Sequence, residues 1–346
     1  MVIAARIQLL PAVIDVTHVF AFSGAGGVLT TFIAAAMRLP PDRLARLTVL
    51  GNPADATGRA ERVRPTLSVV SRAVPAVLSI AGSDSGGGAG IQADLKAFAR
   101  CGVHGMTAIT ALTAQNTVGV TGVHPVPGAF VVEQVRAVAG DIGVDAVKIG
   151  MLGTAEIVAA VDEALDLLEP GTPVVIDPVM VSESGAELLD AAARAALIDT
   201  LLPRATVITP NLPEARALAG EAAPDDVADL ARALHALGPD VVVITGGHRE
   251  EATDVLFDGD GIHLIGGERH PDGAAHGSGC THSSALAAHL ALGSSPLQAA
   301  RAAHAIAADA VRDGLREIGH GPGPVDVIGL TARCPQGSRE ARTSGV

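Results

Sequence analysis

A short segment of small residues around Cys280 has the composition of an anion-binding helix start. Its sequence is HGSGCT over residues 276–281, and the alanine-rich stretch that follows predicts a helix over 280–292. The backbone N–H groups of a helix start point to one spot and the helix dipole adds positive potential there, which suits a phosphoryl group. Cys280 would lie in the first turn, where the pKa of a thiol falls and its thiolate can accept a proton. A role as a small packing residue is an equally good interpretation of Cys280.

A glycine-rich segment over residues 81–90 offers a second place for close backbone contact with a ligand. Its sequence is AGSDSGGGAG, and IQADLK follows within a helix predicted over 89–101. Glycine lets the chain turn sharply and approach a ligand closely. The spacing does not match a dinucleotide fingerprint, because GxGxxG counted from Gly86 would need glycine where Ile91 stands. A flexible turn without a ligand is the alternative.

Further polar groups follow other predicted strands. Asn211 and Glu214 stand three residues apart at a helix start, where both side chains can face a solvated cation. A helix start rich in proline and acidic residues is the common alternative for this pair. Asp177 ends the strand predicted over 173–177, and Thr245 begins the segment TGGH at the end of another strand.

Valine- and isoleucine-rich runs alternate with amphipathic stretches from residue 76 onward. The runs predict strands over 76–81, 106–112, 146–149, 173–177, 206–209 and 241–245. The stretches predict helices over 89–101, 128–140, 154–168, 190–202, 224–237, 280–292 and 296–315. Strands that are apolar throughout are typical of parallel sheets covered on both faces, and the alternation indicates a doubly wound α/β fold. Ligands of such folds bind at the carboxyl ends of the strands, where the polar groups above fall.

The remaining parts of the chain depart from this alternation. Residues 254–257 and 262–265, joined by DGDG, predict an antiparallel hairpin at the edge of the sheet. We expect one α/β domain over 75–330 and a polar C-terminal tail over 331–346. Residues 1–74 predict a poorly ordered N-terminal extension, or translation from a start upstream of the true one. A functional leader or a small extra domain is the alternative for this part.

The composition excludes several classes of protein. With 346 residues, 48% hydrophobic and 18% charged, the chain is not intrinsically disordered. A net charge of −13 and the absence of Trp and Tyr argue against a nucleic-acid partner. No uninterrupted apolar run reaches the length of a membrane span, so no membrane partner is expected. Three cysteines without a CxxC pair indicate a reducing, cytoplasmic location rather than a disulfide framework or a zinc site.

Seven segments, in this order along the chain, carry a family resemblance. They are AGSDSGGGAGIQADLK (81–96), ITALTAQNT (109–117), KIGML (148–152), VIDPVM (175–180), ITPNLPEA (208–215), ITGGH (244–248) and HGSGCT (276–281). Residues 76–329 thereby resemble the ribokinase-like superfamily and, within it, the hydroxymethylpyrimidine/phosphomethylpyrimidine kinases of thiamine biosynthesis. The resemblance implies a three-layer α/β/α fold with a mostly parallel sheet, and a homodimer. It also implies phosphorylation, with ATP and Mg²⁺, of 4-amino-5-hydroxymethyl-2-methylpyrimidine and then of its monophosphate to the diphosphate.

The same resemblance implies which residues bind the pyrimidine. Gly82, Ala89 and Asp94 would hold the ring, and Met151 would line the pocket. Gln115 would face the aminopyrimidine edge, because an amide offers both a donor and an acceptor. With no Tyr or Trp in the chain, we expect specificity to rest on hydrogen bonds at the ring edge more than on stacking.

Phosphoryl transfer is assigned by the resemblance to one short stretch. Gly277, Ser278 and Gly279 would form the anion hole together with Cys280. Cys280 stands at the position of the family's catalytic base, which is Asp in many relatives. As thiolate it would take the proton of the hydroxymethyl group.

The nucleotide and its metal ion are assigned to the ends of other strands. Glu214 and Asp177 would hold Mg²⁺, and Asn211, Thr245 and Gly247 would line the ATP site. Thr245 is a departure, because many relatives have Lys there, so one phosphate-contacting charge is lost or replaced.

Two other functions compete with this interpretation. A pyridoxal or pyridoxine kinase of the same superfamily is the nearest, and Gln115 favours the aminopyrimidine over it. A non-catalytic sensor of nucleotides or vitamin precursors is the other, and the intact Cys280, Asn211 and Glu214 argue against it. The spacings of His270, His276, His282 and His289 fit no zinc pattern, so packing or surface roles are expected for them.

Overall fold

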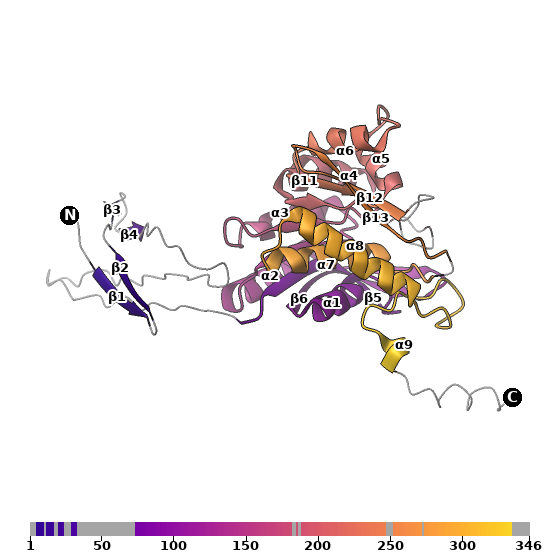
Figure 1. The fold of residues 1–346 in the computed structure, drawn as a ribbon, viewed down its shortest axis with the longest axis horizontal. Coiled ribbons are helices and arrows are strands. Elements are labelled where there is room, and N and C mark those ends of the chain that lie inside the picture. Colours follow the sequence, from indigo (N-terminus) through magenta and orange to yellow (C-terminus); the bar gives the residue numbers. More distant parts are fainter. Residues whose placement is uncertain are drawn as a thin grey trace. The chain divides into compact units, whose positions relative to one another are not determined.

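The structure, a computed structural model, describes residues 73–181, 185, 188–246, 252–271 and 273–333, and four short strands nearer the amino terminus (Figure 1). The chain divides into two units, Met1–Ala73 and Val74–Val346. In the first unit, β1 (Ala5–Leu9) pairs antiparallel with β2 (Ala12–Val16), and β3 (Phe20–Ser23) pairs antiparallel with β4 (Leu29–Phe32). The sequence patterns do not predict these strand pairs. The rest of the predicted N-terminal extension lies outside the described residues, as do residues 334–346 of the predicted tail.

A nine-stranded sheet forms the centre of the second unit. Its order is β13-β12-β11-β10-β9-β8-β5-β6-β7. The strands are β5 (Ala76–Asp84), β6 (His104–Gln115), β7 (Val120–Pro125), β8 (Ala146–Ile149), β9 (Val174–Ile176), β10 (Val207–Ile208), β11 (Val241–Ile244), β12 (Ala252–Phe257) and β13 (Ile262–Gly267). The six strands from β11 to β6 run parallel, and the other three run antiparallel to their neighbours. The predicted parallel sheet and its antiparallel edge hairpin are confirmed.

Helices cover both faces of this sheet (Figure 1). They are α1 (Gly90–Cys101), α2 (Gly128–Asp141), α3 (Ala155–Leu165), α4 (Ala191–Ala196), α5 (Leu212–Ala219), α6 (Val227–His235), α7 (Ser278–Ala291), α8 (Pro296–Arg312) and α9 (Leu330–Arg333). Neighbouring residues of a strand point to opposite faces. Leu78 therefore packs into one core cluster with α2 to α6, while Val77 packs into another with α1, α7 and α8. The three-layer α/β/α architecture is confirmed.

Helices α5 and α9 were not among the predicted helix ranges. Two further elements differ from the sequence-based prediction for physical reasons. Strand β7 was not expected, because VTGVHP has no buried alternate face, and five of its six residues are exposed at the sheet edge, where Pro125 is tolerated. The helix expected over 190–202 begins as α4 but continues as one π turn, Leu197–Leu201, and a 3₁₀ turn that contains Pro203. Proline supplies no N–H for a regular helix, so the segment ends there.

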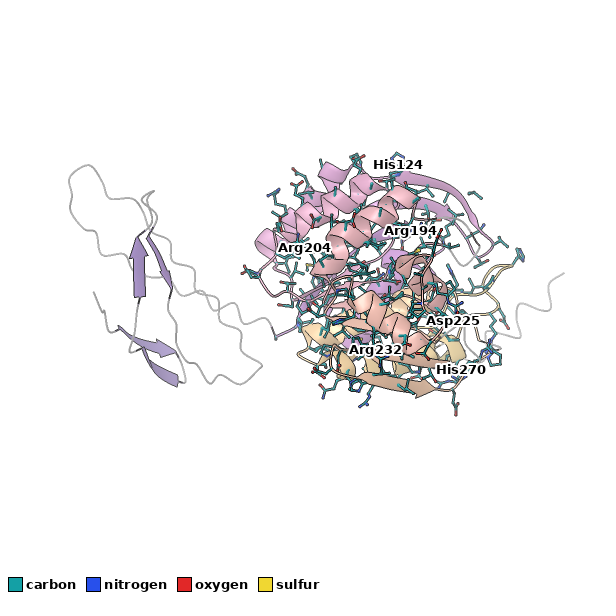
Figure 2. The ribbon with its side chains drawn as sticks, turned by 90° about the horizontal axis from the view of Figure 1, so that it is seen from above. His124, Arg194, Arg204, Asp225, Arg232 and His270 are labelled. Carbon is teal, nitrogen blue, oxygen red and sulfur yellow. The ribbon has the colours of Figure 1, made fainter. Side chains whose placement is uncertain are left out.

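The outer sides of these elements carry polar side chains and also exposed apolar ones, such as Val123 on β7 and Leu264 on β13. The side chains of His124, on β7, and Arg232, on α6, are both exposed, and Figure 2 shows His124 at the edge of the view. Among the described residues, no helix is both long enough and apolar enough to cross a bilayer.

Candidate active site

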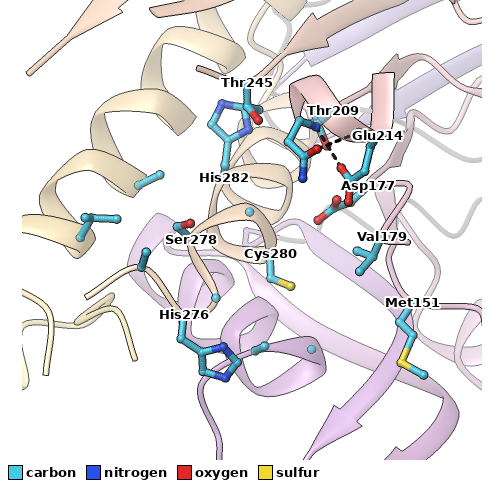
Figure 3. Close-up of a pocket in the computed structure, with 18 of the residues that line it drawn as sticks. Met151, Asp177, Val179, Thr209, Glu214, Thr245, His276, Ser278, Cys280 and His282 are labelled. Atoms are coloured by element: carbon cyan, nitrogen blue, oxygen red, sulfur yellow. Dashed lines mark hydrogen bonds between the residues drawn. The ribbon is translucent and has the colours of Figure 1, made fainter. Parts of the chain in front are cut away.

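One cavity of about 430 Å³ opens at the carboxyl ends of the parallel strands, a size suited to small-molecule ligands (Figure 3). It brings together twelve of the fourteen residues singled out in the sequence. These are Gly82, Ala89, Gln115, Met151, Asp177, Asn211, Glu214, Thr245, Gly277, Ser278, Gly279 and Cys280. Gly247 lies outside the described residues. Asp94 is not part of the cavity wall, because its side chain is fully buried beneath it.

The start of α7 has the geometry of an anion-binding helix end. Gly277 precedes the helix with φ of +86°, a left-handed conformation that favours glycine. A Cβ at this position would also collide with the backbone oxygen of Gly88, so the two glycine-rich segments pack directly against each other. The helix begins at Ser278, two residues earlier than predicted, which leaves Cys280 within the first turn. The first N–H groups of a helix have no partner within it and can bind an anion.

The pKa of the Cys280 thiol is raised, whereas a lowered pKa is expected at a helix start. Its side chain is half-buried, and Figure 3 shows the sulfur on the side of the cavity where Met151 and Val179 lie. The group nevertheless lies deep in the protein, and this burial raises the pKa of Cys280 to about 12, while the charge of Lys148 opposes the rise. Without ligands the residue is a neutral thiol. The predicted lowering of its pKa is therefore wrong for the ligand-free chain, because desolvation outweighs the helix dipole.

A buried lysine in the cavity lining is the main residue that the sequence analysis missed. Lys148 lies in β8 with a fully buried side chain, and its Nζ donates to Asp94 Oδ1 at 3.0 Å. Asp94 also accepts hydrogen bonds from Ser79 at 2.6 Å and Ser284 at 2.7 Å. Burial alone would lower the pKa of Lys148. The charge of Asp94 and of other nearby acidic groups has a larger, opposite effect, so the pKa is raised overall and the amine stays charged. A lysine inside the apolar run AVKI was the available sequence signal.

Two acidic side chains of the cavity lining, Asp177 and Glu214, lie close together (Figure 3). Asn211 and Glu214 form a capping box at the start of α5: Glu214 N donates to Asn211 Oδ1 and Asn211 N donates to Glu214 Oε2, both at 2.9 Å. The helix-start interpretation is therefore correct, and it leaves both side chains on the cavity wall. Burial, and then the charge of Asp177, raise the pKa of Glu214 to about 8. Asp177 accepts from Ser283 Oγ at 3.0 Å, and burial raises its pKa as well.

The raised pKa of Glu214 predicts a pH dependence of stability. In the unfolded chain the carboxyl loses its proton near pH 4.5, whereas in the folded chain it keeps the proton up to about pH 8. Between these values the folded state binds more protons, so stability falls as pH rises. Glu214→Gln retains an acceptor for the capping box but does not titrate. We expect the melting temperature of the ligand-free protein, relative to that of Glu214→Gln, to fall from pH 5 to pH 8. Parallel curves for the two proteins would contradict the assignment.

Comparison with known proteins decides the family. The model of the phosphomethylpyrimidine kinase family matches residues 84–326. The chain belongs to this family. The hydroxymethylpyrimidine/phosphomethylpyrimidine kinase of Rhizobium meliloti is 50% identical over 255 residues, which are 72% of this chain and 95% of that protein. The kinase of the same name from Haemophilus influenzae is 47% identical over 262 residues, which are 73% of this chain and 96% of that protein.

Two solved structures support the same family assignment. A phosphomethylpyrimidine kinase from Clostridium difficile is 40% identical with a TM-score of 0.59, covering 67% of this chain and 96% of that one. The pyridoxal kinase of Staphylococcus aureus, solved with AMP-PCP and pyridoxal, is 35% identical with a TM-score of 0.67, covering 74% of this chain and 94% of that one. The predicted family, ribokinase-like fold, phosphotransferase activity and place in thiamine biosynthesis are thereby confirmed.

Proposed function

We propose that the chain transfers the γ-phosphoryl group of ATP to 4-amino-5-hydroxymethyl-2-methylpyrimidine and then to the resulting monophosphate. One observation carries the proposal: a single cavity holds the helix start with Cys280, the acidic pair Asp177 and Glu214, and the amide of Gln115. These are an anion-binding end, a cation-binding wall and a group that can pair with an aminopyrimidine edge. Cytoplasmic location and a homodimer remain predictions.

The pyrimidine is proposed to bind at the end of the cavity formed by Gly82, Ala89, Gln115 and Met151. The single hydroxyl proton of Thr113 lies within reach of two acceptors, Ser83 O at 2.9 Å and Gln115 Oε1 at 3.2 Å, so the amide of Gln115 is at most partly engaged. The amide nitrogen and the second lone pair of the oxygen are then free for the amino group and ring nitrogen of the substrate. Asp94 does not line this end of the cavity. It accepts hydrogen bonds from Lys148 and Ser284 behind the lining.

Phosphoryl transfer is proposed to occur at the start of α7, where the enzyme mainly positions the reactants and neutralises charge. The N–H groups of Gly277, Gly279 and Cys280 would hold the transferred group, and Cys280 Sγ would accept the proton of the hydroxymethyl oxygen. The N–H of Ser278 already donates to Ala275 O at 2.9 Å. Because the thiol is neutral without ligands, its ionised form must be favoured by the charges that surround the bound substrates. Lys148 already acts in this direction.

Asp177 and Glu214 fit a divalent cation such as Mg²⁺. The charge of Asp177 raises the pKa of Glu214, so the two carboxyls repel each other, and a bound cation would relieve the repulsion. Among the described residues no group of three His, Cys, Asp or Glu side chains is arranged to hold a metal ion, so phosphate oxygens and water would complete the coordination. When bound, Mg²⁺ neutralises the phosphate charge. Asn211, Thr245 and Gly247 are proposed to line the ATP site.

Initial rates with two acceptors test the substrate. We expect ATP-dependent phosphorylation of the aminopyrimidine to be much faster than that of pyridoxal under the same conditions. Pyridoxal is the relevant competitor because several structural neighbours are pyridoxal kinases. A strong preference for pyridoxal would overturn the proposal, and no transfer to either acceptor would favour a sensor.

Substitution of Gln115 tests the basis of that preference. Gln115→Leu is expected to lower kcat/KM for the aminopyrimidine by about tenfold or more, because polar groups at the ring edge would lose their partners. The loss for pyridoxal should be smaller, since it lacks the ring amino group. The ratio of the two kcat/KM values, measured for the wild type and the variant, reports the effect. An unchanged ratio would show that Gln115 does not select the substrate.

A further inference from the structure

One segment, His276–Ser284, makes side-chain contacts with four buried aspartates, which come from β5, α1, β12 and the loop after β9. Its hydrogen bonds are His276 Nε2 to Asp84 Oδ2 at 3.2 Å, His282 Nε2 to Asp254 Oδ2 at 3.1 Å, Ser283 Oγ to Asp177 Oδ2 at 3.0 Å and Ser284 Oγ to Asp94 Oδ1 at 2.7 Å. Cys280 lies in the middle of this segment. The surrounding loops and strands are therefore tied to the residue proposed to accept the proton.

The first histidine contact fixes the glycine-rich segment at the pyrimidine end. Asp84 accepts hydrogen bonds from the backbone N–H groups of Gly86 at 2.7 Å, Gly88 at 2.9 Å and Ala89 at 2.8 Å. Although burial raises its pKa, the bond to His276 and these N–H groups hold the pKa of Asp84 below its usual value, so the carboxylate is charged. A Cβ at Gly88 would collide with the His276 ring, which shows how closely the segment packs on it.

The second histidine contact fixes the chain after β11, at the proposed nucleotide end. Asp254 accepts from Gly246 N at 2.7 Å and from His304 Nδ1 at 2.8 Å in addition to His282. Thr245 N donates to Pro210 O at 2.9 Å, so Thr245 and Gly246 are held from both sides. Burial raises the pKa of Asp254, but the two histidines lower it well below its usual range, which keeps the carboxylate charged.

The ring nitrogens that do not face Asp254 have no hydrogen-bond partner among the described residues. His282 Nδ1 and His304 Nε2 are both buried and unpaired. A proton on either atom would be a buried donor without an acceptor among the described residues, which is costly, so a ring proton is better placed on the nitrogen that faces Asp254. Within the part of the chain that the structure describes, the hydrogen bonds of both rings go to Asp254.

We propose that His276 and His282 are positioning residues that hold the two ends of the cavity in place relative to Cys280. His276 acts through Asp84 on the pyrimidine end, and His282, assisted by His304, acts through Asp254 on the nucleotide end. This inference rests on the proposed function, which assigns the two ligands to these ends. It predicts that the two histidines affect the binding of different substrates although they are six residues apart in one segment.

Leucine substitutions separate the two effects. His282→Leu is expected to raise the Kd of AMP-PCP and the KM of ATP about tenfold, the effect of one lost hydrogen bond to a buried charge, with the KM of the pyrimidine within about twofold of wild type. His276→Leu is expected to raise the KM of the pyrimidine about tenfold, with the Kd of AMP-PCP and the KM of ATP within about twofold of wild type. His276→Gln and His282→Gln should restore most of the loss, because the glutamine amide nitrogen can donate where Nε2 does. His289→Leu, a change farther along α7 outside the cavity, is the matched control and should change neither constant.

The outcomes distinguish failure of the inference from failure of the proposed function. If wild type binds AMP-PCP but neither binds nor phosphorylates the pyrimidine, the proposed substrate is wrong, and the effect of His282→Leu on AMP-PCP still tests the nucleotide end. If each leucine variant raises both constants equally, or neither constant, the inference is overturned. Should a leucine variant fail to fold, as shown by thermal unfolding, Asp84→Asn and Asp254→Asn are expected to give the same split. Their amides retain an acceptor and the native size.

Discussion

Replacement of Cys280 by alanine is expected to slow the first phosphorylation by about 10²–10⁴-fold, the range that a positioned general base contributes. The hydroxymethyl oxygen must lose its proton as it attacks phosphorus. The monophosphate that accepts the second group is already ionised, so the second reaction should lose much less. Separate assays with the pyrimidine and with its monophosphate, each followed by chromatography of the products, measure the two losses.

The acidity of the thiol supplies a control for this prediction. Because burial raises the pKa of Cys280 to about 12 in the ligand-free chain, the ionised fraction, and with it the first rate, should increase as pH rises above neutrality. The ordinary pKa of a carboxyl lies several units below that of a thiol, so Cys280→Asp should be more ionised near neutral pH than the thiol is. It should retain more of the first activity than Cys280→Ala and show a weaker increase with pH than the wild type. Equal losses of both reactions in Cys280→Ala would refute the base role.

Replacement of Lys148 by methionine is expected to destabilise the protein by about 3–5 kcal/mol, the cost of leaving one member of a buried ion pair uncompensated. Asp94 would keep its hydrogen bonds from Ser79 and Ser284 but lose the only charge that contacts it at hydrogen-bond distance among the described residues. A loss of this size is a large part of the stability of an ordinary domain. Urea unfolding of the ligand-free variant measures it.

A double variant and a control at an exposed arginine show whether the loss of stability in Lys148→Met comes from an uncompensated charge or from lost packing. Lys148→Met combined with Asp94→Asn removes both charges and should recover much of the lost stability. Arg232, which pairs with Asp229 at the surface (Figure 2), is the matched control, and Arg232→Met should change stability by less than about 1 kcal/mol. If the two changes at Lys148 and Asp94 simply add, the ion pair does not hold this part of the core together.

The fold was predictable where local pattern and tertiary environment agree. Strand β8 begins and ends where it was predicted, because all four of its residues are buried and three of them are apolar. Strand β7 was missed because its exposed residues carry no such pattern. The capping box of Asn211 and Glu214 was predictable because helix starts are encoded over four consecutive residues.

The candidate site was predictable as a set of positions but not as a set of contacts. Motif residues such as Gln115 and Cys280 line one cavity, as strand topology requires. The partners that determine their chemistry are distant in sequence: Lys148 and Asp94 are 54 residues apart, and His276 and Asp84 are 192 apart. The sign of the pKa shift of Cys280 depends on depth, which no local pattern contains. Asp94, singled out as a ligand for the pyrimidine, instead anchors the buried lysine.

Product analysis with the two acceptors tests the central claim most directly. Purified protein is incubated with ATP and the aminopyrimidine, with and without Mg²⁺, and the monophosphate and diphosphate are separated and quantified over time. The account predicts that ATP consumption requires both Mg²⁺ and the pyrimidine, and that the monophosphate appears first and is then converted to the diphosphate. Absence of both pyrimidine products under conditions in which pyridoxal is phosphorylated would contradict it.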